Sequence, residues 1–295
     1  MSAGTRGTRF LESELPALAP AAARFHVLPV PYEKTVSYGA GTAKGPAAIL
    51  AASSQLERWD GASDPAAEGI YTWPAIDCSG PAPQVIDAIA AAVAKILALG
   101  KTPVVLGGEH TVTGGVIRGY LDAGVRDFGV VQIDAHADLR EAYDGDPLSH
   151  ASVMRRVVEA GVPLVQLGNR AYCEEEREAR VRYKVHAIDA DQLVPQGIHA
   201  ISLPADFPPQ VFFTLDVDGI DPSVLPATGT PVPGGLGWYQ TLGLFESVAR
   251  QRRIIGFDIL EFAPIAGFHA YDFAAALLAY KLMGIVQRAN SAASR

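Results

Sequence analysis

Eight short apolar runs, separated by stretches of helical character, constrain the fold of this 295-residue chain more than any other feature. Strands that read as continuous apolar runs and alternate with helices form parallel sheets covered on both faces. The sequence therefore predicts an α/β protein with a mostly parallel sheet of about eight strands. The predicted strands are 25–32, 70–76, 103–106, 128–133, 163–167, 184–188, 211–215 and 254–260. The predicted helices are 46–59, 81–99, 112–123, 149–160, 171–182, 239–251 and 271–288.

The composition describes a single globular domain preceded by an arm. Hydrophobic residues make up 49% of the chain and charged residues 19%, and no linker or repeat divides it after residue 24. We expect residues 1–24, which contain two prolines and six alanines, to form a flexible or draped N-terminal arm. Residues 25–295 are expected to form one domain.

Charge and cysteine content exclude several kinds of partner. The net charge of −8 argues against a nucleic acid or an anionic membrane surface, since both require a basic face. No apolar run approaches the ~18 residues of a membrane-spanning helix. Cys78 and Cys173 show no disulfide framework or zinc-binding spacing, so a reducing compartment, the cytoplasm, is expected.

Polar side chains follow the predicted strand 128–133, where Asp134, His136 and Asp138 occupy alternate positions. If extended geometry persists, all three side chains project to one side. Unpaired carboxylates are costly to bury, and a divalent cation is their natural counter-ion. Histidine and carboxylates without thiolates favour hard or borderline divalent ions. The alternative interpretation is a capping aspartate beside a chance histidine.

Two more predicted strands end in the same way. Asp216 and Asp218 follow the strand 211–215, and His110 follows the strand 103–106 after two glycines. In open α/β sheets ligands bind beyond the carboxyl ends of the strands, so these side chains are expected to meet. Four carboxylates balance two dications, and the sequence therefore predicts a two-metal site. Its six candidate ligands are His110, Asp134, His136, Asp138, Asp216 and Asp218.

Two further residues are candidates for catalysis. His150 follows the acidic loop that begins at Asp138, and Glu261 stands at the end of the last predicted strand. A surface histidine at a helix start and an ordinary loop carboxylate are the structural alternatives.

Five motifs follow one another along the chain: GGEH (107–110), DAHAD (134–138), DVDGIDPS (216–223), PATGTP (226–231) and GFDILEFAP (256–264). In this order they resemble the ureohydrolase family of arginases and agmatinases, over about residues 25–285. The resemblance implies a three-layer α/β/α arginase-type fold, two Mn²⁺ ions per subunit bound by the six candidate ligands, and a homotrimer or homohexamer. It also implies that His150 shuttles protons, that Glu261 holds the substrate guanidinium, and that Thr230 contributes a hydroxyl near the reacting centre.

The loops expected around the substrate tail favour a small cationic guanidino compound. Residues 140–147 contain three acidic side chains and lack the Asn/Thr/Ser run with which arginases bind an α-carboxylate, and 174–176 is Glu-Glu-Glu. We expect Glu174 to bind the substrate, although acids at a helix start are also favoured by the helix dipole. Residues 30–46 are more similar to agmatinases than to arginases. Hydrolysis of agmatine to putrescine and urea, a step of polyamine biosynthesis, is therefore the leading hypothesis.

Other substrates and other functions stay open. N(1)-aminopropylagmatine suits the acidic loops equally well, Arg140 allows 4-guanidinobutyrate, and arginine itself is a further alternative. A deacetylase-like metal amidohydrolase would share the architecture and the metal preference but has no need of Glu261. A metal-binding scaffold without activity would have lost a ligand or His150, and none is missing.

Overall fold

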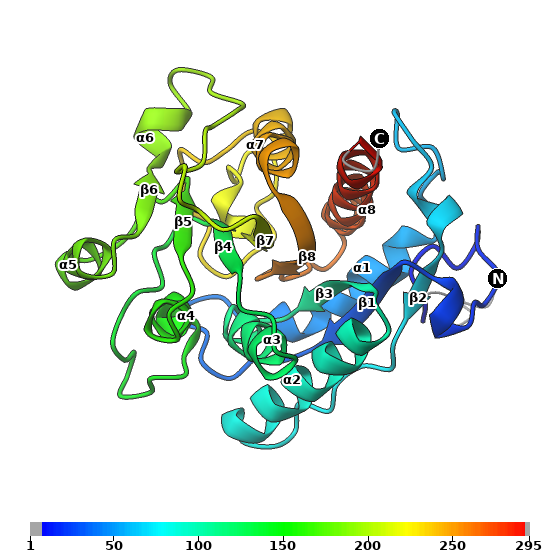
Figure 1. The fold of residues 1–295 in the computed structure, drawn as a ribbon, viewed down its shortest axis with the longest axis horizontal. Helices are drawn as coiled ribbons and strands as arrows, with labels where there is room; N and C mark the ends of the chain where they lie inside the picture. The colour runs from blue at the N-terminus through cyan, green and yellow to red at the C-terminus, as the bar shows by residue number, and fades with distance from the viewer. Residues whose placement is uncertain (1–7, 293–295) are drawn as a thin grey trace.

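The fold is a three-layer α/β/α sandwich around a single sheet (Figure 1). The computed structural model describes residues 8–292. Its eight strands run in the order β2-β1-β3-β8-β7-β4-β5-β6, and every neighbouring pair is parallel. The predicted fold class is thus confirmed, with all eight strands at the expected places. The strands are β1 (Phe25–Val30), β2 (Ile70–Thr72), β3 (Thr102–Gly107), β4 (Phe128–Ile133), β5 (Leu164–Leu167), β6 (His186–Ile188), β7 (Gln210–Asp216) and β8 (Arg253–Leu260).

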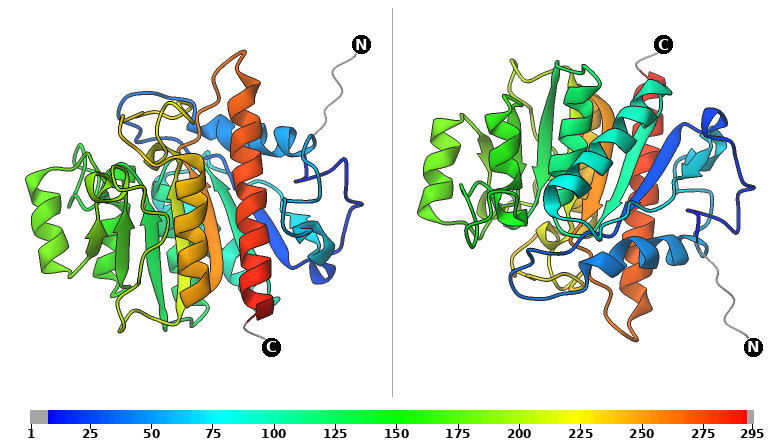
Figure 2. Two further views of the ribbon diagram at one scale, coloured as in Figure 1. Left: turned by 90° about the horizontal axis from the view of Figure 1, so that it is seen from above. Right: turned by 90° about the horizontal axis from the view of Figure 1, so that it is seen from below.

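Helices cover both faces of the sheet. Helices α2, α3 and α4 pack on one face, while α1, α7 and α8 pack on the other (Figures 1 and 2). Each face has its own hydrophobic core, which is why the strands are apolar at nearly every position. The helices are α1 (Gly45–Ser53), α2 (Ala82–Ala98), α3 (Thr111–Asp122), α4 (Val153–Glu159), α5 (Glu174–Arg182), α6 (Ala190–Leu193), α7 (Trp238–Gln251) and α8 (His269–Ala292).

The predicted helices differ from the observed ones mainly at their ends. The helix expected over 46–59 ends at Ser53, and the one expected over 149–160 begins as a 3₁₀ turn, His150–Ser152, before α4. The four-residue α6 was not predicted, because one turn shows no periodicity. Helix α2 matches closely, since Val85, Ile89, Val93 and Ile96 form a buried stripe at helical spacing.

The described part of the N-terminal arm, residues 8–24, lies against the domain. Phe10 and Leu11 are buried, and their backbone N–H groups donate to Thr72 Oγ1 (2.9 Å) and Ser53 Oγ (2.8 Å). Residues 1–7 of the predicted arm lie outside the described residues. Over residues 8–292, no helix is long and apolar enough to span a bilayer.

The register of the central strands brings their carboxyl ends to one edge of the sheet. Ile133 of β4 pairs with Leu215 of β7, and Asp216 of β7 pairs with Leu260 of β8. Strand β8, the last in sequence, lies in the middle of the sheet between β3 and β7. The ends of these four strands and the loops that follow them therefore lie side by side, and they carry all the predicted metal ligands.

Candidate metal centre and active site

The loops after β3, β4 and β7 bring one set of predicted ligands together around His110. Its Nδ1 lies 3.0 Å from Asp134 Oδ2, 2.8 Å from Asp138 Oδ2 and 3.4 Å from Asp216 Oδ2. All four side chains are buried. Ligand atoms of His110, Asp134 and Asp216 lie within 4.8 Å of one another, as they would around a single cation.

A second group adjoins the first. His136 Nδ1 lies 3.0 Å from Asp218 Oδ2 and 3.6 Å from Asp134 Oδ1. Asp134, His136 and Asp218 again have ligand atoms within 4.8 Å of one another. Because Asp134 belongs to both groups, the two groups adjoin, and each could hold a cation with this carboxylate in common. Such an arrangement suits a two-metal hydrolase.

The orientation of His110 fits a metal ligand. Its Nε2 lies 3.0 Å from Thr214 Oγ1, so this nitrogen has a hydrogen-bond partner. Its Nδ1 is buried and has no directed hydrogen bond, although three carboxylate oxygens lie within 3.4 Å. A ring nitrogen whose lone pair faces carboxylate oxygens can bind a cation together with them. The hydrogen bond at the other nitrogen fixes the orientation of the ring.

The charges at this edge of the sheet also suit a cation. Burial raises the pKa of Asp216 well above its usual range, and the neighbouring Asp218 and Asp134 carboxylates add to the effect. Burial likewise raises the pKa of Glu261. Carboxylates that destabilise one another in this way are stabilised as anions when a divalent cation lies between them.

Glu261 stands at the end of β8, beside the ligand groups. Its Oε1 accepts a hydrogen bond from the His110 N–H (2.7 Å), and its own N–H donates to Gly108 O (2.8 Å). Thr230, from the loop after β7, donates to Asp218 Oδ2 (3.1 Å). Both predicted residues line the same cavity as the ligand groups.

His150 is held at the cavity wall by Thr35, a residue that the sequence did not single out. Thr35 Oγ1 lies 3.0 Å from His150 Nδ1 and donates to Glu109 Oε1 (2.7 Å). Because the carboxylate of Glu109 only accepts, the hydroxyl proton points to it, and His150 Nδ1 must donate to Thr35. This leaves Nε2 as the ring nitrogen available to accept a proton. Burial lowers the pKa of His150, and the edge-on ring of Tyr143, with its centroid 5.5 Å away, covers it.

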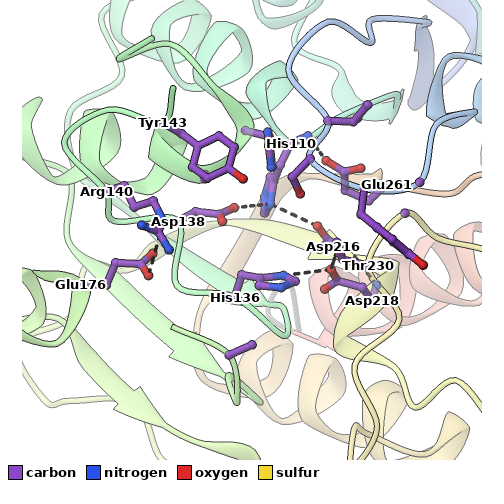
Figure 3. Close-up of a pocket in the computed structure, with 18 residues that line it drawn as sticks. His110, His136, Asp138, Arg140, Tyr143, Glu176, Asp216, Asp218, Thr230 and Glu261 are labelled. Carbon is purple, nitrogen blue, oxygen red and sulfur yellow. Dashed lines mark hydrogen bonds and ion pairs between the residues drawn. The ribbon is translucent and has the colours of Figure 1, made fainter. Parts of the chain in front are cut away.

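The cavity has a volume of about 150 Å³ and extends away from Glu261 toward the loop after β4. Figure 3 shows Arg140 and Glu176 on the side opposite Glu261 and Thr230. Glu174, the predicted substrate ligand, does not line this cavity: its side chain is 67% exposed and pairs with Arg177. Glu176, two residues later on the buried face of α5, lines it instead. Nothing in a run of three glutamates identifies which member turns inward.

Comparison with known proteins agrees with this geometry. Residues 23–284 match the sequence profile of the arginase family. N(1)-aminopropylagmatine ureohydrolase of Synechocystis sp. is 39% identical, over 94% of this chain and 93% of the relative. Agmatinase of Pyrococcus horikoshii is 30% identical, over 95% of this chain and 98% of the relative.

A solved structure shows the same fold over nearly the whole chain. The crystal structure of agmatine ureohydrolase of Thermoplasma volcanium superposes with a TM-score of 0.82 at 28% identity, and 96% of each chain is covered. The family profile, the relatives and the fold all agree with the resemblance inferred from the motifs. The chain belongs to the arginase family.

Proposed function

We propose that this protein hydrolyses a cationic guanidino compound to urea and an amine. The observation that carries this proposal is the convergence of two adjoining ligand groups, Glu261 and His150 on one cavity. The deacetylase alternative shares the metal chemistry but gives no reason for a carboxylate at position 261, and the family match argues against it.

The ligand groups would hold a pair of divalent metal ions, which we expect to be Mn²⁺. The residues around the first ion would be His110, Asp134, Asp138 and Asp216. Those around the second would be Asp134, His136 and Asp218. Such a pair, when bound, lowers the pKa of water so that hydroxide is available near neutral pH.

The protein's own residues would bind and orient the substrate. Glu261, fixed by the His110 N–H, would accept hydrogen bonds from the planar guanidinium and hold its central carbon toward the ligand groups. Thr230 would keep Asp218 in position. His150, with Nε2 free, would accept a proton and deliver it to the leaving amine.

Agmatine and its N(1)-aminopropyl derivative are the two substrates that we propose. Agmatine stays the prediction from the sequence motifs, and the Pyrococcus horikoshii relative has the name agmatinase. The aminopropyl derivative is favoured by the relatives from Synechocystis and Thermus thermophilus, whose names specify it. Either substrate would place the enzyme in polyamine biosynthesis.

Urea release is the experiment that tests this proposal. Purified protein loaded with Mn²⁺ would be given agmatine, N(1)-aminopropylagmatine, 4-guanidinobutyrate and arginine in parallel, with an acetyl-lysine peptide to test the deacetylase alternative. We expect the highest kcat/KM for one of the first two. Absence of urea from all four guanidino compounds would contradict the proposed function.

Assembly and location stay predictions. We propose a homotrimer or homohexamer, which light scattering at several protein concentrations would test. A cytoplasmic location, expected from the two cysteines, would be tested by fractionation of the source cells.

A further inference from the structure

The guanidinium of Arg140 occupies the end of the cavity opposite Glu261 (Figure 3). Its Nε lies 4.0 Å from Glu176 Oε2, and its Cζ lies 5.6 Å from the centroid of the Tyr143 ring. Arg140 follows β4 and belongs to the same loop as Tyr143, whereas Glu176 belongs to α5. A carboxylate and an aromatic ring therefore flank one cation here, and that cation is part of the protein.

Glu176 is unusual for a member of a three-glutamate run because it is only 3% exposed. Its Oε1 accepts from Leu139 N–H (3.1 Å) and its Oε2 accepts from Cys173 N–H (2.9 Å). These bonds fix the carboxylate but do not neutralise it. Over residues 8–292, its one recorded ion pair is the 4.0 Å pair with Arg140. A buried carboxylate with so distant a cation retains the capacity to bind a closer one.

We propose that Glu176 and the Tyr143 ring form the binding site for an ammonium group in the substrate tail, and that Arg140 occupies this site until the substrate displaces it. The proposal rests on the proposed hydrolysis of a guanidino compound and specifies how the tail is selected. Glu261 would bind the guanidinium at one end of the cavity and Glu176 the ammonium at the other.

The chemistry of the two cations favours this exchange. An ammonium is a compact charge that can approach a carboxylate to about 2.8 Å, closer than the present 4.0 Å pair. The Arg140 side chain is 36% exposed, so its long stem can turn toward solvent at modest cost. A cationic tail would otherwise meet a like charge in the cavity. Arg140 therefore competes with the tail, and its removal should strengthen binding of the tail.

The opposite hypothesis is that Arg140 binds a carboxylate tail, as in 4-guanidinobutyrate. It predicts that removal of Arg140 raises the KM for that substrate and leaves cationic tails without benefit. The two hypotheses thus predict opposite changes in KM.

The test uses four variants of the Mn²⁺-loaded protein and two kinds of substrate. The substrates are whichever of agmatine and N(1)-aminopropylagmatine the wild type hydrolyses, and butylguanidine, which has the same guanidinium without a tail charge. Arg140→Ala should lower the KM for the cationic-tail substrate roughly 10-fold with kcat within about 2-fold, and change butylguanidine little. Arg140→Lys, which retains a competing cation, should keep the KM near the wild-type value.

Glu176→Gln should raise the KM for the cationic-tail substrate by roughly 10- to 100-fold and affect butylguanidine much less. Glu175→Gln is the matched control, since it removes one charge from the same turn of α5 at an exposed side chain outside the cavity. Glu175 Oε1 accepts from the Glu141 N–H (2.8 Å), and the amide oxygen of glutamine can keep this bond. Metal content and thermal unfolding of each variant would show whether the site and the fold are retained.

An unchanged or higher KM for the cationic tail in Arg140→Ala overturns the displacement by Arg140. Equal effects of Glu176→Gln and Glu175→Gln, or equal effects of Glu176→Gln on both substrates, overturn the ammonium site. If Glu176→Gln fails to fold, the KM values of Arg140→Ala and Arg140→Lys for the cationic-tail substrate still test whether Arg140 competes with the tail. Failure of this proposal is distinct from failure of the proposed function, because in the latter the wild type itself releases no urea.

Discussion

Two residues of the candidate site have backbone conformations that L-amino acids seldom adopt. Asp138 has φ of 53° and Glu261 has φ of 60°. Each such residue costs about 1–3 kcal/mol, which the surrounding structure must offset. Strain of this kind concentrates at functional sites because it directs a side chain where an unstrained strand end would not. Here it turns two carboxylates into one cavity.

A substitution of Glu261 provides the most direct test of substrate binding. Glu261→Gln keeps an oxygen that can accept the His110 N–H but removes the negative charge. We expect turnover to fall at least about 100-fold while both metal ions remain, because the guanidinium loses its charged partner. Steady-state kinetics together with metal analysis measures both effects, and near-normal turnover would remove the assigned role.

Asp216 tests the two-metal arrangement in the same way. Asp216→Ala removes a carboxylate from the group around His110, so the bound metal should fall below two ions per chain. Elemental analysis after dialysis gives the stoichiometry. Asp206→Ala, an exposed aspartate elsewhere, is the control that should retain the wild-type content. Two ions in both variants would contradict the model of a shared pair.

The site depends on how closely the loops after β1, β3 and β8 approach one another. Gly108 follows β3, and a Cβ built there would lie 1.9 Å from Tyr32 O. The backbone of this segment is fixed on both sides, because Glu109 N donates to Tyr32 O and Glu261 N donates to Gly108 O, both at 2.8 Å. One glycine therefore allows three loops to meet where His110 and Glu261 must lie.

Gly108→Ala should separate these loops. We expect a loss of roughly 1–3 kcal/mol in the free energy of unfolding, and weaker metal binding because His110 moves. Denaturant unfolding and metal titration would measure the two effects. Gly237→Ala is the matched control, since its φ is −75° and no atom lies within 4 Å of the added Cβ. Equal stability of the two variants would contradict the close-approach argument.

The sequence predicted elements well where local patterns are strong and contacts poorly where they join distant segments. Buried parallel strands are apolar throughout, so all eight were found, but the edge strand β2 ends at Thr72, four residues before its predicted end. The six predicted ligands converge in the structure because each stands at or just after the end of such a strand. Thr35 was missed because it contacts His150 across 115 positions, and no local signal marks that contact. The inward turn of Glu176 depends on the packing of α5 and was equally invisible.

His26 links the stability of the whole fold to pH. It is buried at the start of β1, its Nδ1 accepts from Trp73 Nε1 (3.0 Å), and its Nε2 lies 3.0 Å from Pro20 O. The ring is therefore neutral, with its proton on Nε2. Burial lowers the pKa of His26 below its usual 6.5. The same ring connects the N-terminal segment to the sheet.

This lowered pKa predicts that the fold becomes less stable as the pH decreases below 6.5. Below pH 6.5 the unfolded chain binds a proton at His26 while the folded chain does not, so stability falls as the pH decreases from 6.5 toward the lower folded pKa. The free energy of unfolding of the wild type should decline more steeply in this range than that of His26→Gln, by up to about 1.4 kcal/mol per pH unit. Denaturant unfolding at about pH 7.5, 6.5 and 5.5 provides the measurement. Parallel curves for the two proteins would show that His26 does not contribute.

The central position of β8 has a consequence for how the chain is made. Of the eight strands, β8 is synthesised last, and it separates β3 from β7. Until β8 is added, strands of a growing chain could pair only as β2-β1-β3 and β7-β4-β5-β6, each with an unpaired apolar edge. Such edges associate readily with other chains until they are covered. Insertion of β8 covers both edges, and it also brings Glu261, the residue after β8, into the wall of the cavity. Protection during biosynthesis and completion of the cavity thus occur in one step, and a chain truncated before Arg253 should be prone to aggregate rather than persist as a partly active enzyme.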